Sequence, residues 1–265
     1  MATDSSSTTV IRDLTPNITI FSVPFSVLGG KLKIGGRCTV VRLHTGSLAV
    51  FSPVALTPAV QAKLSALGGP VRWIASVNVE HHLHISAWAA AFPGAKVIAM
   101  EGLPEKRERD PATAGTAFAA VFTMENKAGL HVDEEFDSEF KYEYLEATRV
   151  KELVFVHRLS GTLIEGDLIF NLPATESFSG AGEDARAGLV NKVLGHMFQA
   201  KNIGWQRRLL WHGTAAKERE GLAASLRRIS GWEFDRIVPC HGDVIESGGK
   251  GVFEGFGQFY LEKKW

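Results

Sequence analysis

The chain has 265 residues, of which 45% are hydrophobic, enough to bury a substantial core in one large domain or two closely packed halves. Lysine and arginine together number 29, as do aspartate and glutamate, so no net charge attracts nucleic acid or an anionic membrane surface. The two cysteines are too few for a disulfide framework, and no apolar run approaches the ~20 residues that span a bilayer. We therefore expect a cytoplasmic protein that binds neither nucleic acid nor membranes. A homodimer is compatible with this composition.

The ends of the chain differ in character from its middle. Residues 1–12 are polar and lack the charged and apolar regions of a secretory signal, so we expect them to form a disordered tail. Residues 13–265 are expected to form a single domain. Within it, Glu101–Glu135 begins with a charged run and then becomes alanine-rich, which predicts a partly helical insertion on the outside.

Hydrophobic patterns in the first half predict strands followed by alternating helices and strands. Thr57 before Pro58 is typical of a helix N-cap with proline at the first helical position, and Gly68 and Gly69 end that helix. A second helix is expected at Ile85–Phe92. The predicted strands are Ile18–Val23, Cys38–Leu43, Leu48–Val54, Val71–Val77 and Lys96–Met100.

The second half repeats this order, with strands first and helices afterwards. The predicted strands are Phe140–Leu145, Glu152–His157, Thr162–Phe170 and Arg236–Pro239. The predicted helices are Ala185–Phe198, Ala215–Ile229 and Val252–Trp265. Two sheets that face each other, with helices covering their outer faces, explain this twofold order.

Three histidines follow the buried strand Val71–Val77. His81, His82 and His84 lie within four residues, at the carboxyl end of the strand. Neutral imidazole is the commonest nitrogen ligand of zinc and similar ions. A solvated turn would also explain the cluster, so other segments must supply the remaining ligands of a metal site.

Two later segments supply such candidates. His157 ends a predicted strand, and Asp167 follows Gly166 between apolar residues, where a buried carboxylate is costly unless it is paired or bound to a metal. His241 follows the strand Arg236–Pro239 and precedes a glycine, which places it in a loop at the edge of the sheet. A turn aspartate and hydrogen-bonded loop histidines are the alternatives to metal ligands.

Taken together, these segments resemble the metallo-β-lactamase-fold superfamily. The resemblance extends roughly from Thr39 to Gly248, and its specific elements are Asn78–His82, His157–Ile164 and Pro239–Gly242. It implies an α/β fold, a four-layer αββα sandwich, with the ligands at one edge. The metal ligands that it implies are His81, His82, His84, His157, Asp167 and His241, with Asp167 and His82 as the catalytic residues. Zinc is the expected cofactor, as one or two ions, with iron or manganese as alternatives.

The sequence departs from the superfamily's usual pattern in two places. The usual first signature, His-x-His-x-Asp-His, is not reproduced by any register of Asn78–Ile85. In addition, His157 and Asp167 are only ten residues apart, closer than is usual in the superfamily. The site therefore holds one metal ion, two in an altered geometry, or none.

The resemblance implies a metal-dependent hydrolase of a small molecule that carries a lactone, ester, thioester or amide bond. In this hypothesis the histidines hold the metal, and Asp167 bridges or orients the attacking water. A binding protein with a catalytically decayed site is the first alternative, supported by the incomplete first signature. An iron-dependent oxidoreductase on the same fold is the second, because imidazole and carboxylate also suit iron.

Overall fold

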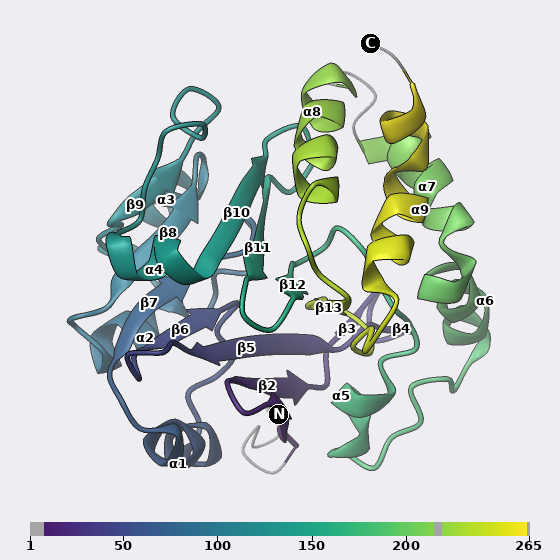
Figure 1. Cartoon of the computed structure of the whole chain (residues 1–265). Helices are drawn as coiled ribbons and strands as arrows, with labels where there is room; N and C mark the ends of the chain where they lie inside the picture. Colours follow the sequence, from purple (N-terminus) through teal and green to yellow (C-terminus); the bar gives the residue numbers. More distant parts are fainter. Residues whose placement is uncertain (1–7, 215–218, 264–265) are drawn as a thin grey trace.

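The structure is a computed structural model, which describes residues 8–214 and 219–263, and its centre is a pair of β-sheets (Figure 1). The first sheet has seven strands in the order β1-β2-β5-β6-β7-β8-β9. Pairing is antiparallel from β1 to β6 and parallel from β6 to β9. The strands are β1 (Val10–Thr15), β2 (Ile18–Val23), β5 (Gly36–Arg42), β6 (Leu48–Phe51), β7 (Val71–Ala75), β8 (Lys96–Met100) and β9 (Ala120–Phe122).

The second sheet has four strands in the order β10-β11-β12-β13, and only β12 and β13 run parallel. Its strands are β10 (Phe140–Leu145), β11 (Glu152–His157), β12 (Thr162–Ile164) and β13 (Arg236–Val238). A separate short hairpin, β3 (Ser26–Val27) and β4 (Leu32–Lys33), projects beside the edge where β13 ends (Figure 1).

Alternation along the strands places apolar side chains on both faces of each sheet. Phe155 of β11 packs into the core between the sheets, where its ring centroid lies 4.9 Å from that of Phe51 of the first sheet. Its neighbours Val154 and Val156 point to the opposite face and pack beneath the helices. Because successive strand residues alternate, one strand contributes to two cores. Full burial of a side chain such as Phe155 stabilises the fold by about 1.5–3 kcal/mol.

Helices cover the two outer faces of the sandwich. α1 (Pro58–Leu67) and α2 (Ile85–Ala91) cover the first sheet through Val60, Leu64 and Trp88. α8 (Arg219–Ser230) and α9 (Gly249–Glu262) cover the second. The other helices are α3 (Leu103–Glu108), α4 (Glu134–Glu139), α5 (Thr175–Ser179), α6 (Leu189–Met197), α7 (Gly204–Leu209), the 3₁₀ turn Ala200–Asn202 and the π-turn Leu210–Thr214.

The predicted αββα sandwich is confirmed, and the start of its first helix is as expected. Thr57 is the N-cap, and its hydroxyl accepts a hydrogen bond from the backbone N–H of Val60 at 3.4 Å. Within the described residues, no helix is long and apolar enough to cross a membrane.

The predicted tail and the predicted outer insertion differ from the structure. The tail prediction extends too far, because β1 begins at Val10 and pairs with β2; residues 1–7 lie outside the described residues. The Glu101–Glu135 segment is more than an outer insertion, since β9 extends the first sheet. α8 begins at Arg219, and the preceding part of the predicted helix, residues 215–218, lies outside the described residues, as do residues 264–265.

The predicted strand Thr162–Phe170 ends early, at Ile164. Gly166 explains the turn, because a Cβ atom there would lie 2.7 Å from Asn78 Nδ2 and 2.8 Å from Glu152 Oε1. Only glycine allows so close an approach of the backbone. Asp167 therefore lies in a loop after β12 rather than inside an apolar strand.

Candidate metal centre

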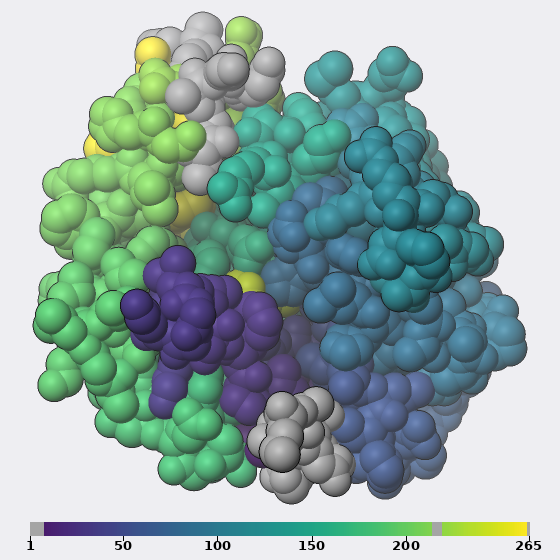
Figure 2. Space-filling view, turned by 180° about the vertical axis from the view of Figure 1, so that it is seen from behind, coloured from purple at the N-terminus to yellow at the C-terminus, as the bar shows by residue number. Residues whose placement is uncertain are grey.

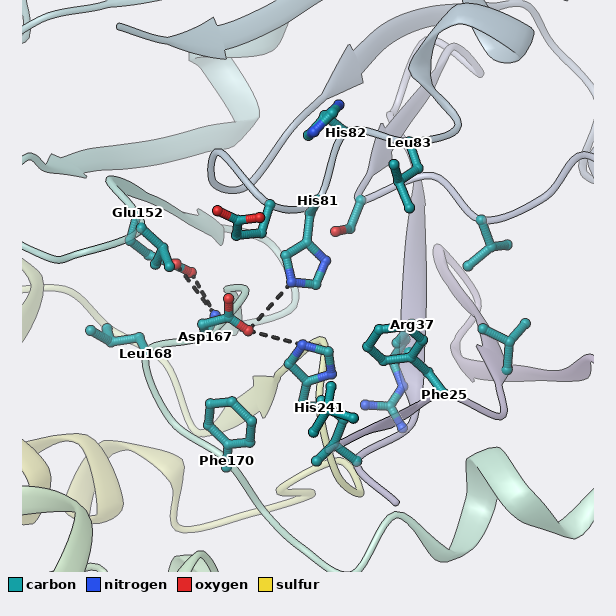
Figure 3. Close-up of a pocket in the computed structure, with 18 of the residues that line it drawn as sticks. Phe25, Arg37, His81, His82, Leu83, Glu152, Asp167, Leu168, Phe170 and His241 are labelled. Atoms are coloured by element: carbon teal, nitrogen blue, oxygen red, sulfur yellow. Dashed lines mark hydrogen bonds and ion pairs between the residues drawn. The ribbon is translucent and has the colours of Figure 1, made fainter. Parts of the chain in front are cut away.

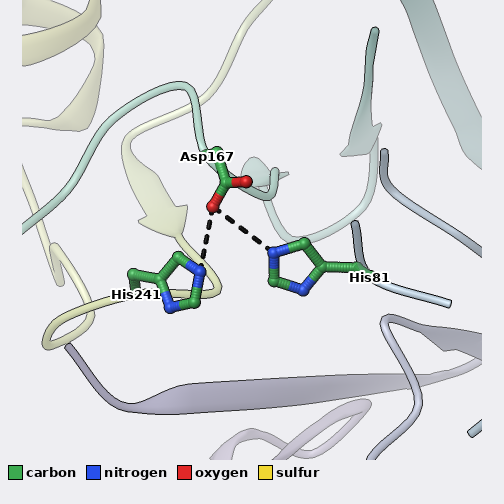
Figure 4. A group of neighbouring side chains, drawn as sticks. All are labelled: His81, Asp167 and His241. Carbon is green, nitrogen blue, oxygen red and sulfur yellow. Dashed lines mark hydrogen bonds and ion pairs between the residues drawn. The ribbon is translucent and has the colours of Figure 1, made fainter. Parts of the chain in front are cut away.

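Three loops meet at one edge of the sandwich, and each follows the carboxyl end of a strand. His81 lies in the loop after β7, Asp167 in the loop after β12 and His241 in the loop after β13. Their side chains point toward one another (Figure 4). Parallel pairing of β12 with β13 brings the last two of these loops to the same edge.

Both imidazole rings direct a nitrogen at the same carboxylate oxygen. Asp167 Oδ1 lies 2.9 Å from His241 Nε2 and 3.3 Å from His81 Nε2. The three potential ligand atoms all lie within 4.8 Å of one another. His241 is 7% exposed, whereas the His81 and Asp167 side chains are 16% and 17% exposed. The group is therefore largely shielded from solvent but still accessible from one side.

The backbone and two aromatic rings orient His241. Its Nδ1 donates a hydrogen bond to the carbonyl oxygen of Gly35 at 2.6 Å, which leaves Nε2 facing Asp167. The rings of Phe170 and Phe25 stack on either side of it, with centroids 5.2 and 6.2 Å away. Such a hydrogen bond on the distal nitrogen is typical of metal-binding histidines, because it selects the tautomer and fixes the ring.

Asn78 joins the His81 loop to the Asp167 loop. It is fully buried, and its side-chain oxygen accepts hydrogen bonds from the backbone N–H groups of Glu80 and His81 at 2.9 and 3.1 Å. Its amide nitrogen donates to Glu152 Oε2 and to Asp167 Oδ2, both at 3.0 Å. Asn78 thereby holds one oxygen of Asp167 and leaves the other to face the imidazoles.

Glu152 supports the same loop from β11. Its fully buried carboxylate accepts hydrogen bonds from the backbone N–H groups of Gly166 and Asp167. We did not single out Asn78 or Glu152 as site residues from the sequence. The available signals were the asparagine of the Asn-x-x-His-His element and an acidic residue at the start of a buried strand, where an unpaired charge is costly.

The carboxylates at this edge differ in their affinity for protons. Burial raises the pKa of Glu152 to about 8, and the negative charge of Asp167 adds to this effect. Burial, together with the charge of Glu152, also raises the pKa of Glu165 well above its ordinary value. Burial acts in the same direction on Asp167, but hydrogen bonds with His241 and His81 outweigh it and lower the pKa of that carboxyl. Asp167 is thus the carboxylate that keeps its charge, as a metal ligand must.

The three donors fit one divalent cation. Ligands about 2.0–2.2 Å from a single ion are separated from each other by about 3–4 Å. Asp167 Oδ1 lies 2.9 and 3.3 Å from the two imidazole nitrogens, close to this spacing. Both ring nitrogens of His241 face oxygen atoms, whereas a neutral imidazole has only one N–H. The single N–H of a neutral ring can serve the Gly35 carbonyl oxygen through Nδ1. A cation bound by both His241 Nε2 and Asp167 Oδ1 would then satisfy the carboxylate oxygen without a second ring proton.

His82 and His84, which we also predicted as ligands, do not join this group. The Nδ1 atom and the carbonyl oxygen of His82 face the guanidinium of Arg107, at 3.2 and 2.6 Å. Burial lowers the pKa of His82, and the positive charges of Lys106 and Arg107 contribute. His84 is the residue before α2 and makes no side-chain capping hydrogen bond. Both histidines nevertheless line the same cavity as the group, and their predicted roles stay predictions.

His157 belongs to a different group of side chains. Its Nε2 lies 3.2 Å from Glu139 Oε2, and its Nδ1 lies 2.8 Å from the hydroxyl of Ser160. The ring is fully buried. β11 places Glu152 at one end, beside Asp167, and His157 at the other end. His157 therefore lies at the opposite end of β11 from the His81–Asp167–His241 group.

A cavity of about 980 Å³ opens beside the metal-binding group. Its lining includes His81, Asp167 and His241, and Figure 3 shows apolar side chains around them. Figure 2 views this face, where the purple segment around β3 and β4 lies between green residues of the later helices and blue residues of the first half. The His81–Asp167–His241 group is thus accessible to a small molecule.

Comparison with known proteins places the chain in a family and in a fold. A family model described as "Domain of unknown function (DUF4336)" matches residues 25–218. No curated protein matches the sequence. Solved structures with the same fold include metallo-β-lactamases and flavodiiron proteins, which confirms the metallo-β-lactamase fold.

Three solved structures illustrate this similarity. The Flv1 flavodiiron core from Synechocystis sp. PCC6803 has a TM-score of 0.62 and 13% identity, over 96% of this chain and 61% of that one. The DIM-1 metallo-β-lactamase has a TM-score of 0.58 and 14% identity, over 97% and 98% of the two chains. A flavoprotein from Thermotoga maritima has a TM-score of 0.56 and 11% identity, over 95% and 60%. The chain thus spans about three fifths of the flavodiiron and flavoprotein chains and nearly all of the β-lactamase.

Proposed function

The chain belongs to the DUF4336 family, and on that premise we propose that it is a metal-dependent hydrolase of a small molecule with an ester, thioester, lactone or amide bond. One observation carries the proposal. Two imidazole nitrogens and one charged carboxylate oxygen converge at the edge of a cavity large enough for a substrate. Catalytic zinc sites commonly have three protein ligands and leave a further position open.

A divalent ion in such a site supplies a Lewis acid and lowers the pKa of bound water toward neutrality. His81, His241 and Asp167 Oδ1 would hold the ion. Asn78 and Glu152 keep the Asp167 carboxylate and its backbone in place, and Gly35 holds the ring of His241. The residues of the chain would thus bind the ion and orient its ligands, which is the usual role of the protein in metal-assisted hydrolysis.

The ligand set supports one ion rather than two. Among the described residues, the group that could hold a metal comprises three side chains. His82 and His84 line the same cavity outside this group, and His157 lies elsewhere, paired with Glu139. The proposal therefore has Asp167 as a ligand of a single ion and a guide for the attacking water. Zinc is the ion that we propose, since two histidines with one carboxylate form a known catalytic zinc site.

An iron-dependent oxidoreductase is the second candidate, and two observations favour it. Two histidines and one carboxylate also form the ligand set of many non-haem iron oxygenases. In addition, flavodiiron proteins are among the similar structures. The reaction separates the two candidates, since hydrolysis needs no redox change and oxidation of a substrate does.

The decisive experiment compares Asp167→Asn with the wild type and with Asp137→Asn as a matched control. Asp137 is also paired with a histidine, His131, at 3.2 Å, but it is outside the cavity. Elemental analysis of protein purified without chelator should give about one equivalent of metal for the wild type and the control, and little for Asp167→Asn. Assays on esters, thioesters and lactones should show turnover that Asp167→Asn lacks.

Other outcomes would point away from hydrolysis. Iron in the purified protein with oxygen consumption, and no hydrolysis of any ester, would favour the oxidoreductase. Absence of metal in the wild type, with no activity restored by zinc, manganese or iron, would favour the alternative hypothesis of a binding protein with a decayed site. Unchanged metal content and activity in Asp167→Asn would refute the role of this residue.

A further inference from the structure

The cavity beside the metal centre is mainly hydrophobic. Its volume of about 980 Å³ lies at the upper end of the roughly 300–1,000 Å³ found for small-molecule sites. Apolar lining residues come from both halves of the sandwich: Val54 precedes α1 on one side, and Phe256 belongs to α9 on the other. The cavity therefore extends across the edge of the molecule and has room for an elongated ligand.

Apolar side chains surround the His81–Asp167–His241 group. Phe25 and Phe170 stack on the ring of His241, and Leu83 lies two residues after His81 (Figure 3). Phe198 packs edge-on against Phe170, with ring centroids 5.7 Å apart, and continues the wall away from His241. A substrate whose reacting bond lies at the metal would thus contact a hydrocarbon surface directly beside that bond.

The rim of the cavity also carries exposed apolar side chains. Phe25, Leu83 and Leu209 line the cavity, although 47%, 69% and 49% of their respective surfaces are exposed. Exposed large hydrophobic residues gathered around one opening are typical of a binding surface for an apolar ligand. Water-filled entrances to sites for polar substrates have no need of such residues.

The charged residues of the cavity are largely engaged elsewhere. Arg37 is fully buried and donates to the Pro239 carbonyl oxygen at 2.6 Å and to the Ser22 hydroxyl at 3.1 Å. Its Nη2 has no hydrogen-bond partner but lies 3.9 Å from Glu176 Oε1. Glu80 pairs with Lys106 at 3.0 Å. Arg149 is exposed at the rim. The described lining therefore lacks a cluster of free cations that would bind a phosphorylated or polyanionic substrate.

We propose that the substrate is an ester or thioester of a straight-chain fatty acid, with the acyl chain in this hydrophobic cavity. The inference rests on the proposed hydrolase function and names the substrate class of the same site. The oxygen of water forms a bond to the acyl carbon, the acyl–oxygen or acyl–sulfur bond breaks, and a proton passes to the leaving alcohol or thiol. The products are the free fatty acid and that alcohol or thiol.

Binding and turnover are measured separately, so that each proposal can fail alone. Calorimetric titration of the full-length protein with butanoic, octanoic and dodecanoic acids reports on the cavity without any catalysis. Affinity should rise with chain length by up to about fourfold per methylene, the factor expected when each added methylene leaves water. Hydrolysis of the corresponding thioesters should show the same order in kcat/KM.

One exposed position away from the metal ligands allows a test in which folding is preserved. Leu209→Asp introduces a charge on the rim and should reduce the preference for octanoyl over butanoyl by about tenfold or more, since burying a charge beside the chain is unfavourable. Leu159→Asp is the matched control. Leu159 is 72% exposed in the turn before β12 and does not line the cavity, so the control should keep the wild-type preference.

The outcomes distinguish the two proposals. If affinity for the free acids rises with chain length while no ester is cleaved, the hydrolase proposal fails and the acyl site stands. If short and long esters are cleaved equally well and the acids do not bind, the hydrolase stands and the acyl site is refuted. Equal loss of preference in Leu159→Asp and Leu209→Asp would also overturn the assignment of this cavity.

Discussion

Two groups among the described residues each combine two histidines with one carboxylate, and only one of these two groups is suited to bind a metal. His81 and His241 face Asp167 at the edge of the sandwich, beside the cavity. His44 and His157 face Glu139 in the second group, at 2.5 and 3.2 Å. The residue types and the distances are similar, so neither explains why the two groups differ.

The difference lies in how the side chains converge and in their access to the cavity. His44 and His157 contact different oxygens of Glu139, Oε1 and Oε2, and the ring of His157 is fully buried. Glu139 also accepts a hydrogen bond from the backbone N–H of His44 at 2.8 Å. In the cavity group, both imidazoles direct Nε2 at the same carboxylate oxygen, on the side open to the cavity. A metal site needs converging donors and access for a further ligand, and a closed hydrogen-bond network has neither.

The largest expected effect is loss of the metal in His241→Ala. Removing a ligand should lower metal affinity by more than about 100-fold, since changes to residues that merely support ligands cost about 10–100-fold. Equilibrium dialysis against zinc would measure this, and circular dichroism would show that the fold is retained. Tight metal binding by the variant would mean that the two histidine groups do not differ as described.

Asn78→Ala should weaken metal binding by about 10–100-fold without removing any ligand, because Asp167 and the His81 loop lose their common support. Asn78→Asp is the more demanding comparison. It keeps the side-chain oxygen that caps the His81 loop but replaces the amide that donates to Glu152 and Asp167. Metal affinity measured by the same dialysis should fall in both variants. Unchanged affinity would show that Asn78 does not support the metal centre.

His157→Ala is expected to have the opposite profile to His241→Ala. Metal content should stay at the wild-type level, while the free energy of unfolding should fall by about 1–3 kcal/mol, because Glu139 and Ser160 lose a buried partner. Urea denaturation monitored by fluorescence, together with elemental analysis, provides both measurements. Loss of metal in this variant would restore His157 as a ligand.

The smallest effect concerns the dependence of stability on pH in the second group. Burial raises the pKa of Glu139, but hydrogen bonds with His44 and His157 outweigh it and lower that pKa below its ordinary value of 4.5. The unfolded chain then binds more protons below about pH 4.5 than the folded protein does, so this stabilising contribution is lost as the pH falls further. Glu139→Gln should flatten the curve of unfolding free energy against pH in this window. An unchanged curve would contradict the assigned shift.

Much of the fold could be predicted because the relevant patterns are local. Strand alternation, the Thr57–Pro58 helix start and the two β-then-helix halves all follow from neighbouring residues. The end of β12 could not be predicted in the same way. The apolar pattern continues through Leu168, Ile169 and Phe170, but contacts of Gly166 with distant residues turn the chain.

The sequence by itself determined that His81 and His241 each follow a strand, since strand ends are encoded in short apolar runs. The same patterns predict Asp167 inside a strand, and only the tertiary contacts of Gly166 end that strand earlier. Only the tertiary structure decided that His81, rather than His82, faces Asp167, because Arg107 holds His82 elsewhere. It also decided that Asn78 supports the site, through contacts with Glu152 and Asp167 that are 74 and 89 positions away along the chain. Such contacts depend on how whole sheets pack, and no local pattern of residues encodes them.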